Sequence, residues 1–148
     1  MSATQSFWAI DWRCRPSWRR ASVNTLWCLA GCSIGDMGTI LAFQLLEIDW
    51  PVMAIMGLAM VNGILTSIAL ETVILSRQMA LDAAFKTAIG MSLISMIAME
   101  LAMNGVDLII MGGARLSLTV LPFMWLAGFL APLPYNYWRL KALGKACH

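Results

Sequence analysis

The chain has 148 residues, of which 60% are hydrophobic and only 12% charged, and its mean hydropathy is +0.75. Soluble domains carry about 25% charged residues, so this composition excludes an ordinary water-soluble fold and predicts an integral membrane protein. The length allows a single domain, and a formal net charge of +2 is too small to indicate a nucleic-acid-binding protein.

The N-terminal segment is basic and rich in tryptophan. It contains Trp8, Trp12 and Trp18, together with four arginines between positions 13 and 20. Indole and guanidinium groups both find partners at the level of the lipid headgroups. We therefore expect residues 1–21 to form an interfacial segment and residues 22–148 to form a transmembrane domain with a short basic tail.

Four segments have the roughly 20 apolar residues that a helix needs to cross the hydrocarbon core of a bilayer. They are residues 22–46, 52–75, 85–106 and 116–137. Met, Leu, Ala and Ile dominate them without sustained alternation, so strands are not expected. Pro51 suits the first turn of the second helix, and Asp107 is expected in the turn after the third. Pro132 and its neighbouring prolines predict kinks in the fourth. The predicted fold is an all-α transmembrane four-helix bundle in the lipid bilayer.

The distribution of Lys and Arg predicts the orientation of the bundle, because cytoplasmic loops carry an excess of both residues. If the N-terminus is cytoplasmic, nine of the ten basic residues lie on that side and only Arg115 lies outside. Both termini are then cytoplasmic. The nine are Arg13, Arg15, Arg19, Arg20, Arg77, Lys86, Arg139, Lys141 and Lys145.

Two carboxylic acids fall well inside predicted spans. Asp36 follows Ser22 by 14 residues and Glu100 follows Phe85 by 15, so at 1.5 Å per residue both lie roughly 21–23 Å above the inner end. A charge at the bilayer centre costs about 2.5–3.5 kcal/mol or more. We expect the first and third spans to touch, with these carboxyls facing each other around a bound cation or a shared proton. Hydrogen bonding that serves only helix packing is the alternative.

Sulfur-containing side chains share the faces of these two acids. Cys28 and Cys32 precede Asp36 at intervals of four residues, and Met96 and Met99 lie on the face of Glu100 with Met103. Thiolate and thioether sulfur favour Cu(I). Met53, Met56 and Met60 form a further stripe, and Met124 has a similar depth. Methionine is also a common filler of apolar gaps, so core packing is the competing interpretation.

The chain closes on Cys147-His148, where a thiol, an imidazole and the terminal carboxylate lie within two residues. This arrangement predicts a cytoplasmic site for metal hand-off, although it also fits an unremarkable tail. Phosphate loops, nucleophile elbows and paired histidines are missing, so we expect no enzyme. The candidate metal ligands are Cys28, Cys32, Asp36, Met96, Met99, Glu100, Cys147 and His148.

Two other functions fit the first span. Gly31 and Gly35 form a small-residue face on which a helix of another subunit could dock, as expected for a non-catalytic accessory subunit of a larger membrane complex. Cys28 and Cys32 could instead serve thiol redox chemistry. That function is the weakest of the three, because a disulfide within one helix would constrain nothing else.

Three blocks of the sequence resemble a family of small bacterial membrane proteins classed as a domain of unknown function. They are TLWCLAGCSIGD from Thr25, SMIAMELAMN from Ser95, and PYNYWRL from Pro134 with the following Gly144-Lys145 and Cys147-His148. The resemblance implies a four-helix domain in the bacterial inner membrane. Some members look like neighbours or fusion partners of copper proteins, which favours copper as the ligand. Trp27 stands where members often carry His, and Asp36 where they often carry Glu.

Overall fold

A computed structural model of the chain describes residues 11–142, except for the side chain of Met91. Five helices account for most of this part: α1 (Arg15–Leu45), α2 (Val52–Ser76), α3 (Leu81–Met111), α4 (Leu121–Leu130) and α5 (Leu133–Ala142). Residues 11–142 contain no strand. The prediction of an all-α fold is confirmed.

Three helices are long and apolar enough to cross a membrane, namely α1, α2 and the Ser92–Met111 part of α3. At 1.5 Å per residue, the 31 residues of α1 extend for about 46 Å, well beyond a hydrocarbon core of about 30 Å. The outward faces of these helices are apolar: Ile34 is 65% exposed, Leu65 59% and Leu101 58%. Large apolar side chains exposed in this number suit contact with lipid rather than with water.

The fourth predicted span differs from the structure. One continuous helix was expected over residues 116–137, but α4 and α5 are separate helices of 10 residues each, each only about 15 Å long. They meet at Ala131 and Pro132. A proline there has no amide hydrogen, and its ring crowds the carbonyl of the residue four positions earlier. The helix is therefore interrupted where the proline kink was predicted, with Ala131 still in the right-handed helical conformation, and neither half alone could cross a bilayer.

The ends of two other helices also differ from the prediction. α1 begins at Arg15 with a proline in its first turn, so the arginines that follow are helical. α3 continues past residue 106 to Met111 and stops at Gly112, whose φ of 71° is left-handed. Glycine adopts this conformation without strain and commonly ends helices. Asp107 consequently lies within α3 and is fully buried, not in the following turn.

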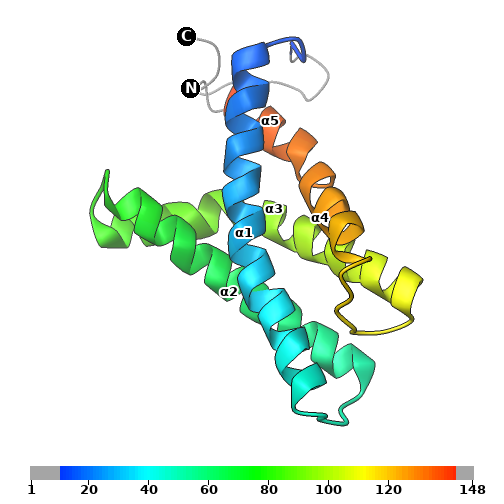
Figure 1. The fold of residues 1–148 in the computed structure, drawn as a ribbon. Helices are drawn as coiled ribbons and strands as arrows, with labels where there is room; N and C mark the ends of the chain where they lie inside the picture. The colour runs from blue at the N-terminus through cyan, green and yellow to red at the C-terminus, as the bar shows by residue number, and fades with distance from the viewer. Residues whose placement is uncertain (1–10, 143–148) are drawn as a thin grey trace.

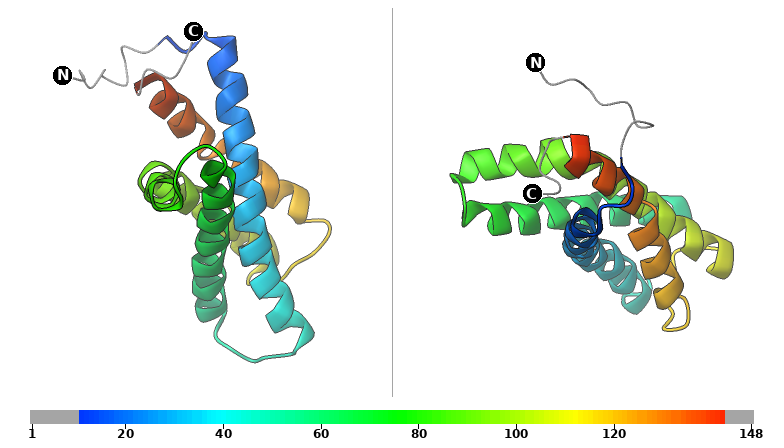
Figure 2. Two further views of the ribbon diagram at one scale, coloured as in Figure 1. Left: turned by 90° about the vertical axis from the view of Figure 1, so that its left-hand side faces the viewer. Right: turned by 90° about the horizontal axis from the view of Figure 1, so that it is seen from above.

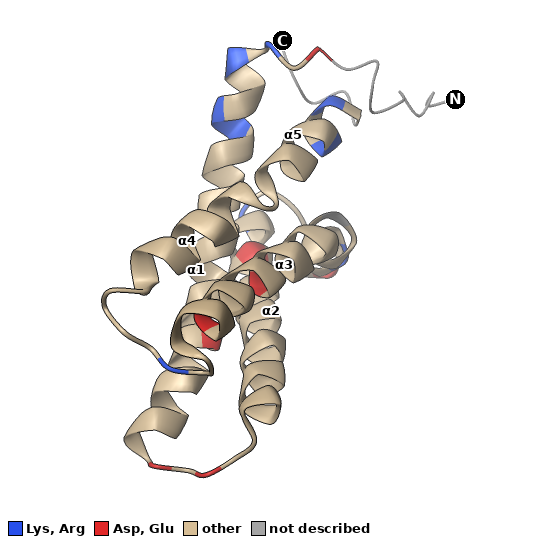
Figure 3. Ribbon diagram, turned by 90° about the vertical axis from the view of Figure 1, so that its right-hand side faces the viewer, with Lys and Arg blue, Asp and Glu red and all other residues tan. Residues whose placement is uncertain are grey.

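The helices form a ring in which α1 contacts α2, α2 contacts α3, α3 contacts α4, and α5 returns to α1 (Figure 1). α2 and α3 run side by side in opposite directions and cross α1 obliquely (Figure 2). Most basic residues gather at the start of α1 and in α5, whereas several acidic residues lie inside the ring and others in turns such as that between α1 and α2 (Figure 3). The acidic residues inside the ring are thus candidates for a functional site.

An aromatic cluster joins the first described residues to α5. The rings of Trp12 and Trp18 stack on Tyr137 with centroid distances of 5.1 and 4.3 Å. The Tyr137 hydroxyl donates a hydrogen bond of 2.6 Å to the carbonyl of Asp11. This aromatic clasp of Trp12, Trp18 and Tyr137 holds both ends of the described chain at one end of the bundle. That this end is cytoplasmic stays a prediction.

Candidate cation site

The contact between α1 and α2 depends on two glycines of α1. A Cβ atom on Gly31 would lie 2.6 Å from the Cα of Ser67, and one on Gly35 would overlap the carbonyl oxygen of Asn62. The Thr66 hydroxyl also donates a hydrogen bond of 2.7 Å to the Gly31 carbonyl. The small-residue face predicted to dock another subunit is therefore covered by this chain's own α2. The accessory-subunit hypothesis loses the surface on which it was based.

Three polar side chains meet where α1 faces α3. Asp36, Glu100 and Asn104 are each at most 3% exposed. The Asn104 amide donates to Asp36 Oδ1 at 3.0 Å and lies 3.4 Å from Glu100 Oε2. Glu100 and Asn104 are one helical turn apart, so they share a face of α3. The predicted meeting of the first and third spans at the level of these carboxyls is confirmed. We call the three residues the acidic centre.

A glycine of α2 forms the third wall of the acidic centre. A Cβ atom on Gly63 would overlap Glu100 Oε1 and lie 3.0 Å from the carbonyl oxygen of Cys32. Only a residue without a side chain leaves room for the Glu100 carboxyl at this point. The sequence analysis did not select Gly63, since nothing in its own neighbourhood marks it.

The acidic centre contains more hydrogen-bond acceptors than donors. Asp36 Oδ2, Glu100 Oε1 and Asn104 Oδ1 are all buried and accept no hydrogen bond. Because the Asn104 amide reaches both carboxyls, Asp36 and Glu100 lie close enough to repel each other when both are charged. The sequence has no Lys or Arg between Arg20 and Arg77 or between Lys86 and Arg115, so the helix segments around both carboxyls carry no basic side chain. Oxygens in this position are satisfied by a proton or by a cation.

Buried sulfur-containing side chains pack next to the acidic centre. The six side chains are all at most 1% exposed, and they pack into one cluster built from α1, α3 and α4. They are Cys28, Cys32, Met96, Met99, Met103 and Met124. We call them the sulfur cluster. Cys28 and Cys32 are free thiols. The α2 methionines Met53, Met56 and Met60 do not belong to this cluster: Met53 is 71% exposed, and Met56 is buried elsewhere.

The candidate ligands do not form a closed metal shell. Across residues 11–142, no three His, Cys, Asp or Glu side chains are arranged to hold a metal ion. The sulfur cluster and the oxygens of the acidic centre instead lie side by side. Cys147 and His148, the predicted hand-off site, fall outside the described residues.

Two further carboxylic acids are buried on either side of the acidic centre. The Ser92 hydroxyl donates to Glu71 Oε2 at 2.6 Å, and the backbone amide of Arg115 donates to Asp107 Oδ2 at 3.1 Å. Glu71 was missed, although a carboxylate inside the predicted 52–75 span was a sufficient signal. Asp107 was recognised but assigned to a loop. Both acids retain one buried oxygen without a hydrogen bond.

Comparison with known proteins places the chain in a family without assigning an activity. The family described as "Domain of unknown function (DUF4396)" matches residues 17–145, so the chain belongs to that family. The resemblance found in the sequence is thereby confirmed. No curated protein and no solved structure matches the chain.

Proposed function

We propose that this member of the DUF4396 family binds a soft monovalent cation, best matched by Cu(I), at the centre of its bundle and moves it across the membrane. One observation carries the proposal. Three buried acceptor oxygens without a hydrogen-bond partner lie directly beside a buried cluster of Cys and Met sulfur atoms. A positive charge would stabilise the buried oxygens, and sulfur ligands favour a soft metal ion.

The energetic argument starts from the two carboxyls. Each negative charge in the hydrocarbon core costs about 2.5–3.5 kcal/mol or more, and Asp36 and Glu100 also repel each other. One monovalent cation together with one proton would neutralise the pair. Asn104 supports this arrangement, because its amide already donates to Asp36 and its own carbonyl oxygen remains free.

The outlying acids support movement of the cation rather than storage alone. Glu71 lies two turns of α2 from Gly63, or about 12 Å along the helix, and Asp107 lies about 10 Å along α3 from Glu100. A cavity of about 230 Å³ is lined in part by Glu71, Ser92 and Arg139. We take this cavity as the entrance on the basic end and Asp107 as the last acid before the opposite loop.

A second candidate function is the movement of protons through the same residues. The observation in its favour is the adjacency of the Asp36 and Glu100 carboxyls, which can share one proton without any metal. The two functions differ in their need for sulfur. Proton movement requires Glu100 but is indifferent to replacement of the methionines of the sulfur cluster.

Direct metal binding tests the proposal. Purified protein in detergent is titrated under reducing conditions with Cu(I) in competition with a chromophoric chelator. Replacing Cys28 and Cys32 together by Ser, which membrane helices tolerate, should weaken binding more than tenfold, which corresponds to about 1.4 kcal/mol. Glu100→Gln should also weaken it, since the isosteric amide carries no charge.

A matched pair of methionine variants controls for packing. Met99→Leu removes a buried thioether of the sulfur cluster, whereas Met53→Leu removes an exposed one, and both substitutions nearly conserve volume. Only Met99→Leu should lower the affinity for Cu(I). If the wild-type protein binds neither Cu(I) nor Ag(I), the metal proposal fails. Proton uptake by reconstituted vesicles that is lost in Glu100→Gln would then favour the second candidate.

A further inference from the structure

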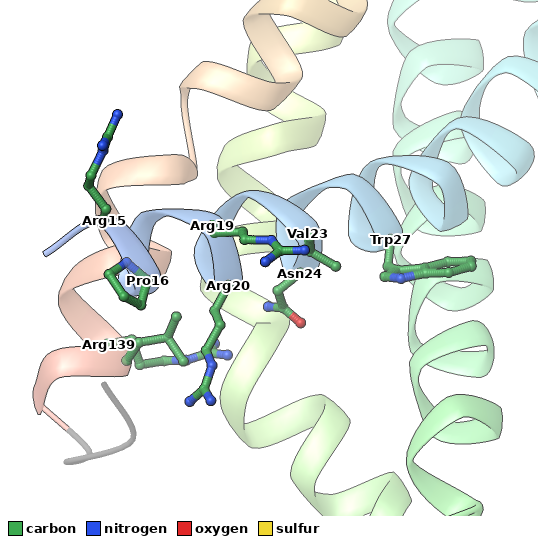
Figure 4. A pocket seen from close by; sticks show the side chains of 9 residues that line it. Arg15, Pro16, Arg19, Arg20, Val23, Asn24, Trp27 and Arg139 are labelled. Carbon is green, nitrogen blue, oxygen red and sulfur yellow. The ribbon is translucent and has the colours of Figure 1, made fainter. Parts of the chain in front are cut away.

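A second, positively charged cavity opens at the end of the bundle where the chain begins. It has a volume of about 860 Å³ and lies between the first three turns of α1 and the end of α5 (Figure 4). Four arginines line it. The lining residues are Arg15, Pro16, Arg19, Arg20, Val23, Asn24, Trp27, Arg139 and Leu140. We call it the arginine cavity. It holds none of the acids or sulfur atoms of the cation site.

Along α1, the side chains that line the cavity change from charged to apolar. Arg15, Arg19, Val23 and Trp27 follow one another at intervals of four residues, so they form one stripe along the helix. Val23 is 48% exposed and Trp27 53% exposed. From Arg15 to Trp27 the stripe runs about 18 Å. The arginines therefore lie at the start of α1, and the apolar side chains lie further along the helix, toward the middle of the bundle.

Arg139 lies on the opposite wall of the cavity, and two of its guanidinium nitrogens donate no hydrogen bond. Its Nε and Nη1 atoms are buried and have no hydrogen-bond partner. A buried guanidinium with free N–H groups lacks the hydrogen bonds that such groups normally make. Guanidinium groups match the oxygens of phosphate in charge and in geometry.

The position of the cavity favours a lipid over a free anion. α1 is about 16 Å longer than the hydrocarbon core, so its first turns extend to the level of the headgroups. A ligand that fills the cavity meets arginines at one end and Val23 and Trp27 at the other. Inorganic phosphate would use the first part only. An anionic phospholipid would use both, with an acyl chain along the apolar stripe.

We propose that the arginine cavity is a specific site for one anionic phospholipid, with the phosphodiester held by Arg19 and Arg139 and one acyl chain lying along Val23 and Trp27. The site contains no residue of the acidic centre, but it shares Asn24, Trp27 and Arg139 with the cavity that contains Glu71, so a bound lipid would border the proposed entrance. Binding of the lipid does not depend on whether the bundle moves a cation.

Native mass spectrometry of the full-length protein tests this proposal. The protein is extracted from bilayers of phosphatidylcholine with a minor share of phosphatidylglycerol, and retained lipid is counted. Wild-type protein should retain one phosphatidylglycerol. Arg139→Gln should lower its occupancy at least about tenfold, and Arg19→Gln, at an exposed position tolerant of substitution, should lower it as well.

A charge-matched control separates a site from general attraction between basic residues and anionic lipid. Arg77→Gln removes one positive charge from an exposed position that does not line the cavity. This variant should retain lipid like the wild type. Equal loss in Arg77→Gln and Arg19→Gln would overturn the proposal. Displacement of the lipid by millimolar inorganic phosphate would also overturn it, in favour of a free anion as the ligand.

Discussion

The contact of the Glu100 carboxyl with Gly63 allows a quantitative prediction about the stability of the protein. In Gly63→Ala, the new Cβ would lie 2.8 Å from the Cδ of Glu100, whereas ordinary contacts begin at 3.4 Å. The carboxyl carbon must withdraw by the difference of about 0.6 Å, and Oε1 must move further. Overpacking of this kind costs about 1–3 kcal/mol.

Gly57→Ala is the matched control, because a Cβ atom on Gly57 meets nothing within 4 Å. Both glycines lie in α2, so both substitutions gain the same helix propensity of about 1 kcal/mol. Gly63→Ala should therefore be less stable than Gly57→Ala by about 1–3 kcal/mol. Unfolding in detergent micelles, followed by tryptophan fluorescence, measures the difference.

A double variant tests the cause of the destabilisation. Glu100→Asp shortens the side chain by one methylene group and withdraws the carboxyl from Gly63. In combination with Gly63→Ala it should recover part of the loss, with a coupling energy of about 0.5–3 kcal/mol. Equal stability of Gly63→Ala and Gly57→Ala would refute the placement of the Glu100 carboxyl. So would an additive double variant.

Three further predictions concern packing and topology. Thr25→Val removes the hydroxyl that accepts a hydrogen bond of 2.7 Å from the Asn136 amide. It should lower the free energy of unfolding by about 0.6–1.7 kcal/mol, the range for interhelical hydrogen bonds in membranes. Thr25→Ser keeps the hydroxyl and should not lower it, so equal unfolding midpoints for the two variants would contradict the hydrogen bond. Gly35→Leu should prevent α1 from packing against Asn62 of α2 and should remove the wild-type elution peak in size-exclusion chromatography. A wild-type elution profile would show that α2 does not cover this face. A reporter domain that is active only in the cytoplasm should be active when fused after Ala142, and one that is active only outside should be active when placed in the α1–α2 turn. The opposite pattern would reverse the orientation.

The sequence was sufficient to find the acidic centre because the relevant distances follow from helix geometry. Counting residues from the span ends placed Asp36 and Glu100 at one level, and the periodicity of α1 and α3 placed sulfur beside them. The same arithmetic would have found Glu71, had all carboxylates inside spans been considered. Asp107 was misassigned because the preference of Gly112 for ending a helix outweighs the polarity of a single acid.

Other features depend on contacts between helices, which no single segment reveals. Gly31 and Gly35 were correctly recognised as a packing face, but the partner helix proved to be α2 and not another subunit. Gly63 matters only through the carboxyl of a different helix. The break at Pro132 could be predicted as a kink, yet its extent depends on how α5 packs against α1.

The aromatic clasp has a consequence for the biosynthesis of the protein. Tyr137 and Asp11 are separated by 126 residues, and ribosomes add about 5–20 residues per second, so roughly 6–25 s pass between the synthesis of the two partners. During that interval Trp12 and Trp18 lack the Tyr137 ring on which they stack in the structure. Arg139 is made equally late, so the arginine cavity also forms only at the end. α5, the last of the described helices, thus completes the aromatic clasp, and premature termination before α5 would leave the first helix inserted but its leading turns undocked.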